Sequence, residues 1–224
     1  MFFYDVNKNM EVNFYLVRHG ESVANVSSDN RIMGRSVDVE LTSDGESQAM
    51  KTGKFFKENG IMFDAIYSST AVRTLETARL CLEAMDVSMH INVDERILEL
   101  DQGGWQGLSR EIYKRDDVRK ALEHDNWNYI PGDDQPGESQ KMVADRMKSW
   151  IQTKINEHSE NESNQNILVF THGLAIKFLL AELLDLDRST AYKDTIDNAS
   201  ITLLTFTDGD LNLPLKMRNN TGHL

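Results

Sequence analysis

Cysteine is the first shortage in this sequence, because Cys81 is the only one among 224 residues. A single cysteine supports neither an internal disulfide framework nor a zinc site built from several thiolates. Cys81 lies on the apolar stripe of a predicted helix, so we expect it in the core. Long apolar runs are also missing, and no stretch reaches the roughly 20 residues that a membrane-spanning helix needs.

Positive charge is the second shortage. Lysine and arginine number 24 against 36 aspartates and glutamates, which leaves a formal net charge of -12. Nucleic acids and anionic membranes attract an excess of positive charge, so we expect neither as a partner. A small anionic ligand is not excluded, because it responds to the charges of its pocket. The amino terminus has neither the basic start nor the apolar run of a signal peptide, and we expect a cytoplasmic protein.

Two apolar runs end in the same dipeptide, His-Gly. Residues 14–17 lead into Arg18, His19 and Gly20, and residues 167–171 lead into His172 and Gly173. Each run has the length and composition of a buried strand. Ligands of open α/β sheets bind outside the carboxyl ends of the strands, so neighbouring strands would bring the two histidines together there. A helical pattern follows the second dipeptide, and backbone N–H groups near Gly173 could hold a phosphate.

Strands and helices alternate along the rest of the chain, which favours a parallel α/β sheet. A helix is expected over residues 43–60, a strand over 63–69, a helix from 70 and a weak strand near 91–93. A later helix, from 138 to 158, should turn these residues inward: Met142, Val143, Met147, Trp150, Ile151 and Ile155. We expect one domain over residues 1–224, with a lid inserted at about 104–137.

The first His-Gly dipeptide has the components of a phosphoryl-transfer site. A neutral imidazole such as that of His19 can attack phosphorus and form a phosphohistidine, which divides a difficult displacement into two easier ones. Charge accumulates on the phosphoryl oxygens during that attack, so cations are needed around them. Arg18, adjacent in sequence, supplies a planar and permanently charged fork.

A series of short motifs extends this pattern through residues 14–206. They are Arg18-His19-Gly20-Glu21-Ser22 with Asn25, Leu41-Thr42 with Gly45, Ser68-Ser69 with Arg73, Leu98-Glu99 before Gly104-Trp105-Gln106-Gly107, Gly137-Glu138-Ser139, and Thr171-His172-Gly173. In this order they resemble the histidine phosphatase superfamily, which includes cofactor-dependent phosphoglycerate mutases and many phosphatases. The resemblance implies a three-layer α/β/α sandwich with a mostly parallel central sheet.

The resemblance also implies a role for each matching residue. His19 would be the nucleophile that becomes phosphorylated, and Glu99 would protonate the leaving oxygen and then take a proton from water. The phosphoryl group would be bound by these residues: Arg18, Asn25, Arg73, His172 and Gly173. No metal and no cofactor are implied, and the remaining histidines show no metal-ligand spacing. Each role has a plainer alternative: Arg73 could be a surface arginine paired with Glu76, and Glu99 one more solvated carboxylate.

A metal-independent phosphatase acting on a small phosphorylated metabolite is the favoured function. A cofactor-dependent phosphoglycerate mutase is the alternative, and it would need extra cations for a second phosphate. The lid offers only Lys114-Arg115 and Arg119-Lys120, mixed with acidic residues in the manner of a solvated helix face. A non-catalytic phosphate-binding regulator is the third possibility.

The lid also carries four aromatic residues, which either shape a leaving-group pocket or pack the lid itself: Trp105, Tyr113, Trp127 and Tyr129. Gln106 and the acidic residues Asp133 and Asp134 depart from the family pattern and weaken any transfer of substrate identity. The pattern leaves the physiological substrate and the oligomeric state open.

Overall fold

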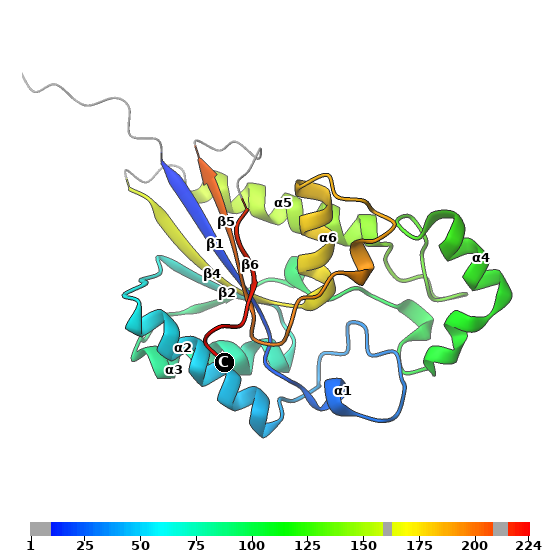
Figure 1. Cartoon of the computed structure of the whole chain (residues 1–224), viewed down its shortest axis with the longest axis horizontal. Coiled ribbons are helices and arrows are strands. Elements are labelled where there is room, and N and C mark those ends of the chain that lie inside the picture. The colour runs from blue at the N-terminus through cyan, green and yellow to red at the C-terminus, as the bar shows by residue number, and fades with distance from the viewer. Residues whose placement is uncertain (1–9, 159–162, 208–214) are drawn as a thin grey trace, which may run out of the picture.

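The computed structural model describes residues 10–158, 163–207 and 215–224. Its centre is a six-stranded sheet in the order β3-β2-β4-β1-β5-β6 (Figure 1). The strands are β1 Glu11–Arg18, β2 Ala65–Ser68, β3 Ile91–Val93, β4 Gln165–Thr171, β5 Ile201–Thr207 and β6 Leu215–Asn220.

The sheet is mixed, and its parallel part positions the two His-Gly dipeptides. Strand β1 lies parallel to β4 with Arg18 opposite Thr171, so His19 and His172 leave the sheet side by side. Strands β2 and β3 continue the parallel part, whereas β5 and β6 are antiparallel. Strand β6 was not anticipated from the sequence pattern.

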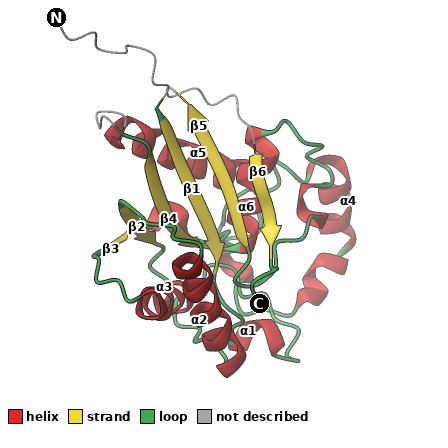
Figure 2. Ribbon diagram, turned by 60° about the vertical axis from the view of Figure 1, so that its left-hand side comes forward, coloured by secondary structure: helices red, strands yellow, loops and turns green. Residues whose placement is uncertain are grey.

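Helices cover both faces of the sheet (Figures 1 and 2). Helices α2 (Ser43–Glu58) and α3 (Val72–Met85) pack on one face. Helices α5 (Gln140–His158) and α6 (Gly173–Leu183) pack on the other. This arrangement confirms the expected three-layer α/β/α sandwich.

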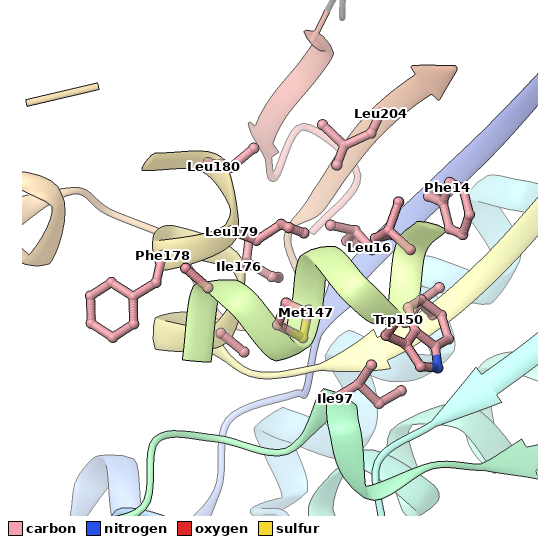
Figure 3. Packing of buried hydrophobic residues seen from close by; sticks show 14 of the residues in the cluster. Phe14, Leu16, Ile97, Met147, Trp150, Ile176, Phe178, Leu179, Leu180 and Leu204 are labelled. Atoms are coloured by element: carbon pink, nitrogen blue, oxygen red, sulfur yellow. The ribbon is translucent and has the colours of Figure 1, made fainter. Parts of the chain in front are cut away.

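The larger hydrophobic core lies between the sheet and helices α5 and α6 (Figure 3). Trp150 is fully buried and meets Phe14 of β1 edge-on, with 6.1 Å between ring centroids. Full burial of such side chains stabilises the fold by about 1.5–3 kcal/mol each. The inward stripe of α5 is as predicted except for Met142, which is 45% exposed. Met142 precedes Val143, and successive helical residues differ by about 100°, so it points away from the stripe.

The second core contains the single cysteine. Cys81 of α3 is fully buried, as expected, and burial raises the pKa of its thiol. Helix α2 approaches α3 closely at Gly53, where an added Cβ would lie 2.2 Å from the carbonyl oxygen of Cys81. Only glycine therefore fits this crossing.

The predicted lid contains short helices and loops beside the main body. It holds two 3₁₀ turns, at Gly103–Trp105 and Arg110–Lys114, and helix α4 (Asp116–Asp125). Trp105 and Val118 bury against Ile32, which joins the lid to the loop after β1. That loop also contains a short helix, α1 (Val23–Val26), which the sequence analysis did not anticipate, and further 3₁₀ turns lie at Glu95–Ile97 and Ala191–Lys193. In the described part of the chain, no helix combines the length and apolar character needed to cross a membrane.

Candidate active site

The two histidines meet at the carboxyl ends of β1 and β4. The ring centroids of His19 and His172 lie 5.4 Å apart, and both side chains are buried. The chain after β1 passes close to α2, because an added Cβ at Gly20 would lie 2.4 Å from the carbonyl oxygen of Gly45 in the first turn of that helix. Only glycine therefore fits at position 20, directly after His19.

His19 has the tautomer of a nucleophile. Its Nδ1 lies 2.7 Å from the carbonyl oxygen of Gly20, and a carbonyl can only accept, so Nδ1 carries the proton. The lone pair of the neutral ring is then on Nε2. Burial first, and then the charges of Arg73 and Arg18, lower the pKa of His19 well below 6.5. The ring is therefore neutral at pH 7.

His172 belongs to a chain of hydrogen bonds in which each group donates to the next, from Arg73 to the backbone carbonyl of Ala71. Nη2 of Arg73 donates to Nδ1 of His172 (3.1 Å), so Nε2 carries the proton and donates to Oγ of Ser69 (2.8 Å). Oγ of Ser69 lies 2.7 Å from Oγ1 of Thr74, which in turn donates to the carbonyl of Ala71. Sequence reasoning placed Ser69 in a motif without giving it a role, and it missed Thr74.

Arg73 is a buried cation and Arg18 a partly buried one, and backbone carbonyls anchor both. Nη1 of Arg18 donates to Ile196 O at 2.6 Å, and no described residue occupies its Nη2. Nη1 of Arg73 donates to Ser36 O, and the Arg73 residue is only 5% exposed. The alternative of a surface Arg73 is therefore wrong.

Asn25 presents an N–H donor because its oxygen is already occupied. Oδ1 of Asn25 accepts from the backbone N–H and hydroxyl of Ser22 (both 3.0 Å) and from Nδ2 of Asn198 (3.1 Å). Asn25 lines the cleft, and its Nδ2 has no hydrogen-bond partner among the described residues. Asn198 also donates to the backbone carbonyl of His19 at 3.1 Å. No local pattern pointed to Asn198, which lies 179 residues from His19 along the chain.

Replacing Asn198 by alanine should weaken substrate binding without removing the nucleophile. Asn25 would lose a donor that fixes its side-chain orientation, so we expect KM to rise about tenfold with a smaller change in kcat. Steady-state kinetics on an aryl phosphate measures both. The exposed Asn59→Ala variant, at the carboxyl end of α2, is the control. Unchanged kinetics in Asn198→Ala would contradict this orienting role.

Glu99 lies across the same space, at the amino end of α6. Its Oε1 accepts from the backbone N–H groups of Leu100 (3.0 Å) and Ala175 (3.1 Å), and its Oε2 from Leu174 (3.2 Å). The expectation that this helix end offers free N–H groups to phosphate is therefore wrong for Leu174 and Ala175, because a carboxylate competes for the same donors. Gly173 packs against Arg18, where an added Cβ would come within 3.3 Å of Nε.

Glu138 holds the Glu99 loop through two arginines. It pairs with Arg35 (2.6 Å) and Arg146 (2.9 Å), and each arginine also donates to the backbone carbonyl of Glu99. Burial would raise the pKa of Glu138, but the hydrogen bond and charge of Arg146 and the charge of Arg35 outweigh it and lower the pKa. Glu138 belongs to one of the sequence motifs, but its pairing with two arginines was not predicted.

The site opens as a cleft of about 200 Å³. Of the predicted residues it is lined by Arg18, His19, Asn25, Arg73 and Glu99. His172 lies behind the wall, fully buried and in contact with Arg73, so its direct contact with a phosphoryl group stays a prediction. In the described ranges no cluster of His, Cys, Asp and Glu side chains could hold a metal ion.

Of the four lid aromatics, some pack the lid and one lines the cleft. Trp105 is buried against Tyr113 and Tyr129, and Trp127 is buried against Phe178, so both tryptophans pack the lid. Tyr113 lines the cleft.

Comparison with known proteins gives consistent matches. The sequence model of the histidine phosphatase superfamily (branch 1) matches residues 14–219. Phosphoserine phosphatase 1 of Hydrogenobacter thermophilus is 30% identical, covering 95% of this chain and 94% of that protein. A 2,3-bisphosphoglycerate-dependent phosphoglycerate mutase of Caulobacter is 29% identical, covering 76% of this chain and 79% of its own. The solved structure of an Entamoeba histolytica phosphoserine phosphatase mutant with phosphoserine has a TM-score of 0.76 at 28% identity, covering 95% of this chain and 99% of that one.

Proposed function

We propose that this chain, which belongs to the histidine phosphatase superfamily, hydrolyses phosphate monoesters through a phosphohistidine on His19. The observation that carries the proposal is the environment of that ring. His19, whose lone pair is on Nε2, lines the cleft together with the cations Arg18 and Arg73 and with Glu99. A nucleophile, two cations and a carboxylic acid are the groups that the two displacement steps require.

In the first step, Nε2 of His19 attacks phosphorus and the bond from phosphorus to the ester oxygen breaks. Protonated Glu99 gives its proton to that oxygen, and the alcohol leaves. In the second step, Glu99 takes a proton from water as the water oxygen attacks phosphorus, and the bond to Nε2 breaks. Inorganic phosphate and neutral His19 result. Arg18 and Arg73 stabilise the phosphoryl oxygens in both steps, and Asn25 donates one hydrogen bond.

A phosphatase is favoured over a phosphoglycerate mutase by the charges of the lid. Arg115 pairs with Asp117 and Asp133, and Arg119 pairs with two acidic residues of its own helix. Arg115 and Arg119 are therefore held by carboxylates and are not free for a second phosphate, whereas Arg110, beside the cleft, forms no ion pair with a described residue. A mutase remains the alternative because relatives of both kinds match the chain. A non-catalytic phosphate-binding protein is the third candidate.

Phosphorus NMR of one sample distinguishes these candidates. The protein is given EDTA, 3-phosphoglycerate and a trace of 2,3-bisphosphoglycerate, and an aryl phosphate is added later. We expect inorganic phosphate from the aryl ester even with EDTA present, because the proposed mechanism uses no metal. We expect no isomerisation of 3-phosphoglycerate. Rapid appearance of 2-phosphoglycerate would identify a mutase. If neither 3-phosphoglycerate nor the aryl phosphate reacted, the non-catalytic binding protein would be favoured.

The physiological substrate is proposed to be a small phosphorylated metabolite. Support comes from the Entamoeba histolytica neighbours, whose structures were solved with phosphoserine and with 3-phosphoglyceric acid. A cytoplasmic location, a single domain with a lid, and the absence of nucleic-acid and membrane partners stay predictions.

A further inference from the structure

The catalytic cleft continues into a second cavity of about 420 Å³. The two share four lining residues: Gln102, Arg110, Tyr113 and Tyr192. The second cavity lies between the lid and the segment that follows α6. Its volume falls within the roughly 300–1,000 Å³ of small-molecule pockets, so it can hold far more than a phosphate.

The walls of the second cavity suit an apolar ring. Its lining contains three tyrosines and several aliphatic side chains: Tyr113, Tyr129, Tyr192, Leu100, Leu122 and Pro131. Tyr113 is fixed by the hydrogen bond from its hydroxyl to Oε1 of Gln102 (2.9 Å), and burial raises its pKa to about 12, so it stays neutral. Lys177 donates to the backbone carbonyl of Tyr192 and lies 5.7 Å from the centre of its ring.

Contacts between the two walls close the far end of the cavity. Nδ2 of Asn126, on the lid, donates to the carbonyl of Ser189 at 3.4 Å, and both residues line the cavity. Beside them the guanidinium of Arg188 lies 5.3 Å from the ring of Trp127. The lid and the segment after α6, which bound the second cavity, therefore contact each other directly.

The uncompensated charge in this cavity is positive. Its two carboxylates are already paired, Glu123 with Arg119 and Glu138 with Arg35 and Arg146. In contrast, Arg110 and Lys193 line the cavity and form no ion pair with any described residue. Lys193 lines only the second cavity, whereas Arg110, whose Nε donates to the backbone carbonyl of Arg31, lies where the cavity meets the cleft. Cations without a carboxylate partner beside apolar walls, on a chain with a net charge of -12, indicate an anionic ligand.

We propose that the second cavity is the leaving-group subsite, and that the substrate is the phosphate monoester of an alcohol carrying a ring and, beyond it, a carboxylate or similar anion. The phosphoryl group sits at His19, the ring passes Tyr113 and Tyr192, and the anion meets Lys193. This inference rests on the proposed phosphatase activity and adds to it a class of substrate.

Three synthetic esters test the subsite: propyl phosphate, 3-phenylpropyl phosphate and 3-(4-carboxyphenyl)propyl phosphate. Their alcohols are primary and similar in pKa, so intrinsic reactivity is matched and differences in kcat/KM report binding of the rest of the molecule. We expect the ring to raise kcat/KM about tenfold or more, as burial of an aromatic side chain does, and the carboxylate to raise it about fivefold further. Tyr192→Ala should lower the ring's advantage about tenfold, and Lys193→Gln should remove only the advantage of the carboxylate.

Matched controls come from the lid. Ile130 is 46% exposed and Lys120 is an exposed residue of α4, and neither lines the cavity, so Ile130→Ala and Lys120→Gln should keep both ratios. Equal kcat/KM for the three esters in the wild-type protein would overturn the subsite and leave the phosphatase intact. Tyr192→Ala lowering all three equally would show a structural role and also overturn it. Turnover of none of them, without labelling of His19, would refute the activity itself.

Discussion

Replacing His19 by asparagine is expected to abolish turnover while leaving the fold intact. Asparagine can keep the hydrogen bond to the carbonyl of Gly20 through its amide N–H, but it has no lone pair where Nε2 was. We expect kcat/KM to fall by at least about 10⁴, the order of loss when a catalytic nucleophile is removed. The acid-labile phosphohistidine should also vanish when the protein is quenched during turnover.

The exposed His90→Asn variant controls for the loss of a histidine as such, and it should retain both activity and label. Phosphate should still bind His19→Asn, because Arg18 and Arg73 remain, and a thermal shift with inorganic phosphate would show it. If His19→Asn kept more than a hundredth of the wild-type activity, or still carried the label, the nucleophile would have to be sought elsewhere.

Replacing Glu99 by glutamine should separate esters by the quality of their leaving groups. An alkyl alcohol is a poor leaving group and needs a proton as it departs, whereas a nitrophenolate does not. General acid catalysis contributes about 10²–10⁴-fold, so alkyl phosphates should slow by about 10³. Formation of the phosphohistidine from 4-nitrophenyl phosphate should slow less than about tenfold.

The same substitution should make the phosphohistidine accumulate. Its hydrolysis needs Glu99 as a base, so a burst of nitrophenol about equal to the enzyme concentration should precede a slow steady state. Rapid-quench kinetics measures the burst, with the exposed Glu95→Gln as the control. Equal losses on alkyl and aryl esters would remove Glu99 from the acid role and leave it a structural contact of α6.

The parts of the site that the sequence predicted are those set by strand ends. His19 and His172 follow apolar runs, and the parallel pairing of β1 and β4 is enough to place them 5.4 Å apart. Cys81 and most of the inward residues of α5 were predictable for a similar reason, because the spacing of apolar residues along a helix shows which face is buried. The prediction that Met142 points inward was wrong, because the exposure of a residue at the edge of the stripe depends on how α5 is rotated against the sheet.

The parts that the sequence did not predict depend on segments meeting in space. Asn198 reaches His19 across 179 residues, and Glu138 reaches the Glu99 loop through Arg35 and Arg146. The hydrogen bonds from the first turn of α6 to Glu99 are also tertiary contacts. They occupy the backbone N–H groups of Leu174 and Ala175, which the local pattern had suggested for phosphate. Neither spacing nor composition carries information about such contacts.

The burial of the two histidines has a consequence for the stability of the whole protein. Burial is the first cause that lowers the pKa of both His19 and His172 well below 6.5, so the folded chain keeps them neutral where the unfolded chain would protonate them. Stability is therefore fully present above about pH 6.5 and is lost as the pH falls below it, by about 1.4 kcal/mol per pH unit for each ring until its folded pKa is reached. A phosphate dianion in the cleft would favour the protonated rings and oppose this loss. The empty enzyme is thus sensitive to mild acid, and the occupied enzyme is protected by its own ligand.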